Sequence, residues 1–232
     1  VLFLTMCWNL FQSPVHVWSN LSFRPYAGLF ALALVLGGVA FTNMWDLPVF
    51  WAAFVAIAAI KAYSARGGNL WEVAKRTVPI AVVVIGLALL FFLPYYLTFT
   101  TQVSGIAPVR AATTRPLHLI IVWALFLVAV TPFIMSVFWQ TTVRQDWARL
   151  SFISVAVGFL PFVVWAFLYL EGGGTSAELP RRFFHVLPFA LVISIAVYST
   201  LWLAKEGESS SGKVFALALS ALGLLLIMGP EL

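Results

Sequence analysis

Long apolar runs, separated by short polar segments, divide the chain into seven stretches that are each long enough to cross a membrane. Each run is close to the roughly 20 residues that an α-helix needs to span a bilayer, and Pro, Gly and charged residues mark its ends. The predicted spans are residues 26–42, 47–63, 77–99, 117–139, 150–170, 183–203 and 214–228. The pattern therefore predicts an all-α, polytopic transmembrane helical bundle, with residues 1–232 forming a single transmembrane domain.

Composition supports this fold class. Hydrophobic residues make up 62% of the chain and charged residues 9%, whereas an ordinary soluble domain is roughly 25% charged. The formal net charge of +5 does not indicate nucleic acid, because the Lys and Arg residues lie in short loops rather than on one basic face. Membrane lipids are therefore the expected partners. The chain begins at Val1 and ends in "LIMGPEL", directly after an apolar run, so we expect an internal piece of a longer membrane protein.

The distribution of positive charge predicts an orientation. One side of the predicted spans carries nine basic residues: Arg24, Lys61, Arg66, Lys75, Arg76, Arg144, Arg149, Lys205 and Lys213. The other side carries the remaining four: Arg110, Arg115, Arg181 and Arg182. Because Lys and Arg concentrate in cytoplasmic loops, the first side is predicted to be cytoplasmic. We expect a prokaryotic plasma membrane with the Asp46 turn on its extracytoplasmic face.

The segment "FTNMWDLPVF" places a carboxylate between two apolar spans. Asp46 stands two residues before Pro48, where it could cap the following helix and interact with the positive end of its dipole. Ionisable groups near membrane depth also tend to mark functional sites, so Asp46 is the candidate catalytic residue. Asn43 and Trp45 flank it as candidate substrate contacts, although an asparagine cap and an interfacial tryptophan are equally consistent with the pattern.

A second candidate lies at the end of the third span, in "FFLPYYLTF", and in the outer loop 100–116. Pro94 is expected to kink the helix or end its regular part, and the loop is longer than the topology requires. Such a segment suits either a substrate cover or an interfacial anchor. Its candidate substrate contacts are Tyr95, Tyr96, Arg110 and Arg115.

The third candidate is "LPRRFFHVLPF". Arg181 and Arg182 are adjacent near a predicted helix start, on the side where arginine is disfavoured, and His185 follows within one turn. Two guanidinium groups near a helix N-terminus suit a phosphate, while contact with lipid headgroups explains them equally well. The three histidines, His16, His118 and His185, are too far apart in sequence for a local metal motif, and the cofactor is unknown.

Several of these segments together resemble a known group of membrane proteins. "NMWDLPVF", "FFLPYYLTFTTQVSGIAPV", "TTRPLHLIIVWALFL" and "MGPEL" look like the YYY family of multi-pass membrane proteins (Chlor_Arch_YYY). That family resembles the C-type glycosyltransferases, which take a sugar from a polyprenyl-phosphate donor at the outer membrane face. The resemblance implies that Asp46 acts as general base or metal ligand, with Arg181 and Arg182 binding the lipid phosphate.

Two other classes of function remain open. A transporter or flippase of a lipid-linked or small solute would place polar groups at the bilayer midplane, where Thr131, Pro132 and Ser136 are the best candidates. A membrane scaffold without catalytic activity is the third hypothesis.

Overall fold

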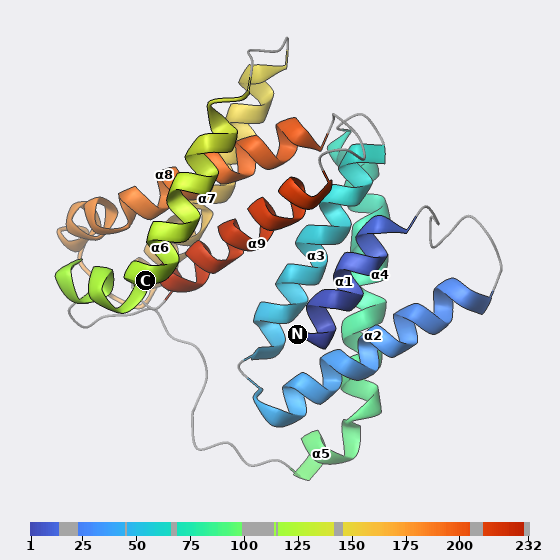
Figure 1. The fold of residues 1–232 in the computed structure, drawn as a ribbon. Helices are drawn as coiled ribbons and strands as arrows, with labels where there is room; N and C mark the ends of the chain where they lie inside the picture. The colour runs from blue at the N-terminus through green and yellow to red at the C-terminus, as the bar shows by residue number, and fades with distance from the viewer. Residues whose placement is uncertain are drawn as a thin grey trace. The chain divides into compact units, whose positions relative to one another are not determined.

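The computed structural model of the chain describes residues 1–13, 23–44, 46–65, 69–98, 114, 116–141, 146–204 and 211–229, and they belong to two compact units, Val1–Ser104 and Gly105–Leu232. The elements of the described residues are all helices: α1 (Leu2–Gln12), α2 (Phe23–Thr42), α3 (Asp46–Ala65), α4 (Leu70–Phe91), α5 (Leu93–Thr98), α6 (Pro116–Phe138), α7 (Trp147–Glu171), α8 (Glu178–Leu203) and α9 (Ser211–Met228) (Figure 1). The predicted all-α fold is confirmed. A single domain over residues 1–232 stays a prediction.

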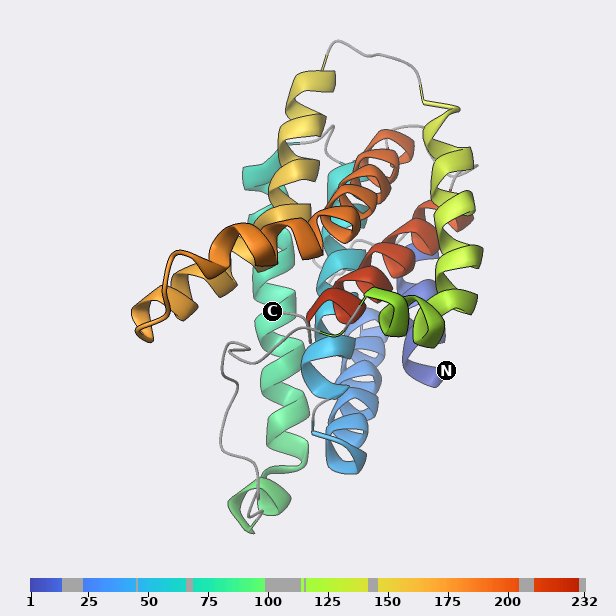
Figure 2. The same cartoon turned by 90° about the vertical axis from the view of Figure 1, so that its left-hand side faces the viewer.

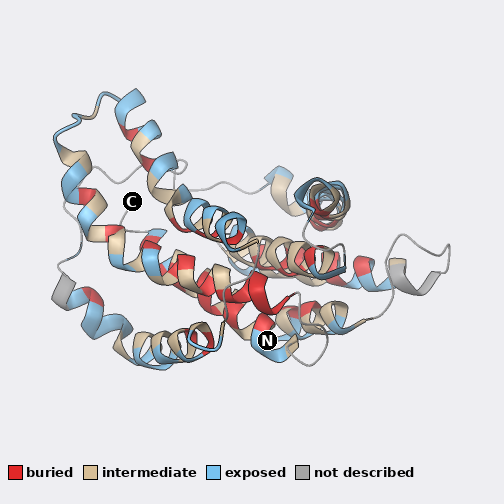
Figure 3. Cartoon of the chain, turned by 90° about the horizontal axis from the view of Figure 1, so that it is seen from above, coloured by how far each residue is buried: buried red, intermediate tan, exposed pale blue. Residues whose placement is uncertain are grey.

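Each predicted span coincides with helix: the third is divided between α4 and α5, and α1 lies before the first predicted span. Six of the described helices are long and apolar enough to cross a membrane: α3, α4, α7, α8, α9 and the part of α6 from His118 to Phe138. The apolar part of α2, Tyr26–Thr42, is shorter. In Figure 3 the buried positions form stripes along the helices, while other faces stay exposed. This pattern is expected when the lateral faces of a bundle meet lipid rather than protein.

Two helices begin more than one turn before the predicted start. Helix α4 begins at Leu70 rather than residue 77, because the Asn69 side chain accepts hydrogen bonds from the backbone N–H groups of Trp71 and Glu72 at 3.1 and 3.5 Å and so caps a polar first turn. Helix α8 begins at Glu178 rather than residue 183. Hydropathy alone misses such turns because their polar residues fall outside the apolar run.

In the first unit, α2, α3 and α4 pack side by side. The tightest approach is at Gly37, where a Cβ atom would stand 2.7 Å from the backbone carbonyl oxygen of Ala88 and 2.5 Å from the ring of Phe92. The indole Nε1 of Trp51 donates a hydrogen bond to the carbonyl oxygen of Ala81 at 3.1 Å, which joins α3 to α4. Small residues at helix crossings allow the close backbone contact that stabilises helix pairs in lipid.

Lys61 ties α1 to α3. Its Nζ donates hydrogen bonds to the carbonyl oxygens of Leu10 and Ser13, at the C-terminal end of α1. The last carbonyl groups of a helix lie at the negative end of its dipole, so an ammonium group is favourable there. The rings of Phe3 and Phe50, 5.5 Å apart, add a second contact between the two helices.

Replacing Lys61 by methionine is expected to loosen α1 locally. Methionine keeps most of the apolar stem but has no donor, and a hydrogen bond from a charged group contributes about 1.5–3 kcal/mol. We expect hydrogen–deuterium exchange of the backbone amides of residues 2–12 to accelerate at least about tenfold, since tenfold corresponds to about 1.4 kcal/mol. Lys75→Met is the control, because Lys75 is exposed and pairs with Glu72 inside α4. Equal acceleration in both variants would contradict the role of Lys61.

In the second unit, α8 is the common packing partner of α6, α7 and α9. In the view of Figure 2, α8 runs between α6 and α7. The crossing of α7 and α8 is tightest at Gly158, where a Cβ atom would stand 2.6 Å from the backbone carbonyl oxygen of Ala190. Ser154 and Ser194 are buried at the same crossing. Each helix thus presents two small residues four positions apart, a spacing typical of close helix pairs in membranes.

Candidate functional site

The turn between α2 and α3 holds the candidate catalytic carboxylate. The N–H group of Asn43 donates to the carbonyl oxygen of Val39 at 2.9 Å and closes α2, and the N–H group of Asp46 donates to the carbonyl oxygen of Asn43 at 3.0 Å. Asp46 is half-buried and is the first residue of α3, so it lies inside the first turn rather than before it. The helix dipole favours a carboxylate in this position.

An aromatic cluster adjoins this turn. The ring of Phe41, two residues before Asn43, lies 4.7 Å from the ring of Tyr95 and 5.8 Å from that of Phe92, centroid to centroid. The rings of Tyr95 and Tyr96 are 5.4 Å apart with an edge-to-face geometry. The end of α4 and all of α5 therefore lie at the same end of the first unit as the Asp46 turn. The predicted break near Pro94 is confirmed, since α4 ends at Phe91 and Pro94 lies in the separate helix α5.

The Tyr96 hydroxyl is buried and has no hydrogen-bond partner among the described residues. Burial raises the pKa of this phenol, and the neighbouring Tyr95 raises it further. Tyr96 therefore stays neutral at physiological pH and keeps its proton, so it is available as a hydrogen-bond donor.

In the second unit the two adjacent arginines have opposite surroundings. Arg181 is exposed, and its Nη1 lies 4.0 Å from Glu178 Oε2. Arg182 is 5% exposed, and its guanidinium lies over the ring of Trp165, 5.1 Å from the centroid. His185 is half-buried one turn further along α8. The two guanidinium groups therefore do not face one direction, because successive helical residues point about 100° apart.

Trp165 also belongs to a pair of stacked aromatic rings that the sequence analysis did not predict. Its ring is stacked on that of Tyr169 at 4.8 Å with an interplanar angle of 20°. Tyr169 is covered by the turn after α7, where the N–H group of Gly174 donates to the carbonyl oxygen of Tyr169 at 2.9 Å and Gly173 has φ +84°. The four-residue spacing of Trp165 and Tyr169 on a helix was the available signal, because such residues stack on one face.

Three predicted site residues, Trp45, Arg110 and Arg115, lie outside the described residues, as does nearly all of loop 100–116. Within the described part of the chain, no group of three or more His, Cys, Asp and Glu side chains is arranged to hold a metal ion. A divalent metal at Asp46 would therefore need ligands from elsewhere or from the substrate.

The long apolar helices and their lipid-compatible surfaces define a polytopic α-helical integral membrane protein. The chain belongs to the family described as "Uncharacterized membrane protein (DUF2298)", whose model matches residues 1–232. No curated protein and no solved structure matches the chain. The membrane location is thus established at the level of the family, while the orientation and the prokaryotic plasma membrane stay predictions.

Proposed function

We propose that this protein is a membrane glycosyltransferase of the C type that takes a sugar from a polyprenyl-phosphate donor at the extracytoplasmic face. The observation that carries the proposal is the shared end of the first unit, where the Asp46 turn adjoins the aromatic cluster of Phe41, Tyr95 and Tyr96. A carboxylate beside aromatic faces suits a sugar-transfer site, since aromatic rings offer flat apolar surfaces to a sugar and a carboxylate accepts a proton. The resemblance of "NMWDLPVF" and "FFLPYYLTF" to the YYY family supports the same class.

In this reaction the hydroxyl oxygen of the acceptor attacks the anomeric carbon of the donor sugar. Asp46 takes the hydroxyl proton as the new C–O bond forms, and the bond between the anomeric carbon and the phosphate oxygen breaks. The polyprenyl phosphate leaves with the bonding electron pair. Asn43, which is exposed, is suited to hydrogen bonds with sugar oxygens, while Tyr96, whose hydroxyl is buried, contributes its ring to the aromatic cluster.

Within the second unit, Arg181 is the residue suited to bind the phosphate of a lipid, because a phosphate requires a positively charged partner. Arg181 is exposed, whereas Arg182 is buried on Trp165. Arg182 then acts through packing at the start of α8, next to Arg181 and His185. An exposed guanidinium binds phosphate through paired N–H donors, which a buried one already covered by an indole does less well.

The competing hypothesis, a transporter or flippase, gains less support. Transporter sites are typically formed by helices that are interrupted near the bilayer midplane. Here α4, α6, α7 and α8 each contain an inner proline, Pro79, Pro132, Pro161 and Pro188, yet each continues as one helix through it. The break that does occur, between α4 and α5, is at the end of a span.

The test is the Asp46→Asn variant of the full-length protein. Asparagine accepts the same backbone hydrogen bonds at a helix start, so a purely structural role costs at most about 1 kcal/mol. Because asparagine cannot act as a base, we expect sugar transfer to fall by at least about 100-fold, in line with the contribution of a general base. Transfer is measured with undecaprenyl phosphate carrying radiolabelled hexoses, and folding by the melting temperature.

Glu72→Gln is the matched control, because Glu72 is also an acidic residue in the first turn of a span. It should leave transfer unchanged. A fully active Asp46→Asn variant, or a wild-type protein that transfers no sugar from any of these donors, would reject the proposal.

A further inference from the structure

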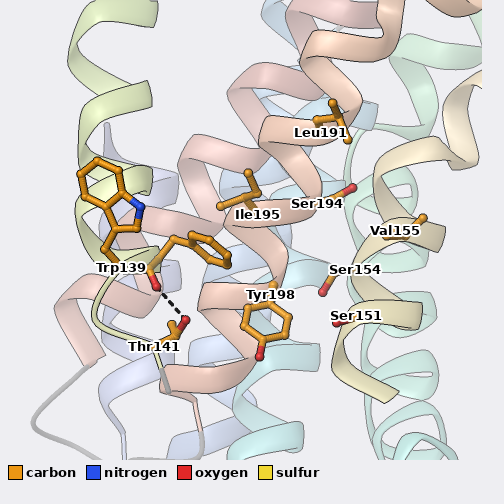
Figure 4. A pocket seen from close by; sticks show the side chains of 10 residues that line it. Trp139, Thr141, Ser151, Ser154, Val155, Leu191, Ser194, Ile195 and Tyr198 are labelled. Atoms are coloured by element: carbon orange, nitrogen blue, oxygen red, sulfur yellow. Dashed lines mark hydrogen bonds between the residues drawn. The ribbon is translucent and has the colours of Figure 1, made fainter. Parts of the chain in front are cut away.

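A cavity of about 500 Å³ lies in the second unit, between one end of α6, the first turns of α7 and the second half of α8 (Figure 4). This volume is within the range of about 300–1,000 Å³ that is typical of ligand pockets. Val155 lines it from α7, and Leu191 and Ile195 from α8. At one end the ring of Phe138 meets that of Tyr198 at 6.0 Å in an edge-to-face contact. The cavity is thus walled by three different helices of one unit.

The cavity opens next to the tight crossing of α7 and α8 at Gly158. Ser154 and Ser194 belong both to that crossing and to the cavity wall, and Figure 4 shows their side chains between the two helices. Their hydroxyl groups donate to the carbonyl oxygens of Leu150 and Ala190, each at 2.7 Å within its own helix. With these donors satisfied, the serines offer little to a polar solute, and the wall is mainly a hydrocarbon surface.

The end of the cavity near Trp139 is polar. The Thr141 hydroxyl donates to the carbonyl oxygen of Phe138 at 2.6 Å, and Lys213 Nζ in α9 donates to Gln140 Oε1 at 3.4 Å. Lys213 is an exposed cation, and its partner Gln140 stands between two residues of the cavity lining, Trp139 and Thr141. Tryptophan is enriched at membrane interfaces. One end of the cavity is therefore apolar and the other carries positive charge.

We propose that this cavity binds one acyl chain of an anionic phospholipid whose headgroup lies at Lys213 and Gln140. The three helices that line it are long and apolar enough to cross a membrane, so in a bilayer a lipid tail reaches the cavity without crossing water. A tail fills an apolar space that water would occupy with too few hydrogen-bond partners. The ammonium group of Lys213 selects a negatively charged headgroup.

The experiment uses the full chain reconstituted in mixed phosphatidylglycerol and phosphatidylcholine vesicles, with phosphatidylglycerol bearing a photoreactive diazirine in its acyl chain. Mass spectrometry of the crosslinked peptides then maps the lipid. We expect the peptides containing Val155 and Ile195 to be labelled at least about threefold more than the lipid-facing surface of α6 at Leu125 and Val128, which are 88% and 72% exposed. Equal labelling of both regions would show only unspecific boundary lipid and would overturn the proposal.

Two variants test whether the labelled lipid lies in the cavity. Val155→Phe fills the cavity mouth and should reduce labelling of the Ile195 peptide at least threefold, whereas Val163→Phe adds the same volume elsewhere on α7 and should not. Both valines are exposed on α7, at 49% and 57%. Should Val155→Phe fail to fold, Leu191→Phe provides the same test from α8. Labelling that persists when the cavity is filled would overturn the site.

The headgroup and the lipid class are tested separately. Lys213→Gln should abolish the preference for phosphatidylglycerol over phosphatidylcholine, and an unchanged preference would overturn the headgroup assignment. Unlabelled phosphatidylglycerol should displace the probe, while undecaprenyl phosphate should not. Displacement by undecaprenyl phosphate alone would overturn the phospholipid assignment and favour an isoprenoid tail. The outcome is independent of sugar transfer, because neither the probe nor the readout involves Asp46.

Discussion

Replacing Gly158 by leucine should destabilise the second unit by about 3 kcal/mol or more, at the upper end of the range for overpacked sites. Even a single Cβ atom would stand 2.6 Å from the carbonyl oxygen of Ala190 and would also meet the hydroxyl of Ser194. The carbonyl belongs to the backbone of α8 and cannot move aside by a change of rotamer. The two helices must therefore separate, and the contacts along their whole crossing weaken together.

Gly86→Leu is the matched control for this prediction. Gly86 also lies inside a span, and a Cβ atom added there meets nothing within 4 Å. Leucine has the higher helix propensity, so the control variant should be at least as stable as the wild type. The free energy of unfolding is measured by titration with sodium dodecyl sulfate in mixed micelles. If the two variants unfold at the same detergent fraction, the tight crossing at Gly158 is not a determinant of stability.

The second large effect is expected at Arg182. Arg182→Gln removes a guanidinium that is buried over Trp165, and a desolvated cation–π contact contributes about 2 kcal/mol. Glutamine also leaves part of the space filled by the arginine stem empty. We therefore expect a loss of about 2 kcal/mol in the same titration. Arg182→Lys should recover only part of it, because an ammonium group lacks the planar surface that stacks on an indole.

Arg181, the residue next to Arg182, serves as the control for this prediction. Arg181→Gln should change the unfolding free energy by less than about 0.5 kcal/mol, since its contact with Glu178 is a long, exposed ion pair. The same variant is expected to weaken binding of undecaprenyl phosphate, which Arg182→Lys should leave intact. A larger stability loss for Arg181→Gln than for Arg182→Gln would reverse the roles assigned to the two arginines.

Hydropathy predicted the helices well because crossing a membrane depends mainly on the length of an apolar run, which is a local property. The starts of α4 and α8 were missed because their first turns are polar and are defined by hydrogen bonds, such as the cap at Asn69, rather than by hydrophobicity. The end of α4 was predictable, since the residue before Pro94 is disfavoured in a continuing helix. The sequence therefore predicted the apolar spans but not the residues at which their polar first turns begin.

The candidate site was predictable in part. The sequence singled out Asp46, Tyr95 and Tyr96, but their common location depends on the contact between Phe41 and Tyr95, which joins residues far apart in the chain. The different environments of Arg181 and Arg182 follow from the direction in which each side chain leaves α8 and from the presence of Trp165 on α7. Neither fact is visible in the order of residues alone, because both arise when helices pack.

The position of α8 has a consequence for the biogenesis of the protein. Helices α6 and α7 are made before α8, yet each packs on α8. While the nascent chain ends at α7, the small residues Ser154 and Gly158 face lipid or the insertion machinery instead of a partner helix. The contacts of α6 and α7 with α8 thus cannot all form until residues up to 203 have entered the membrane, and the packing of α9 on α8 follows later still.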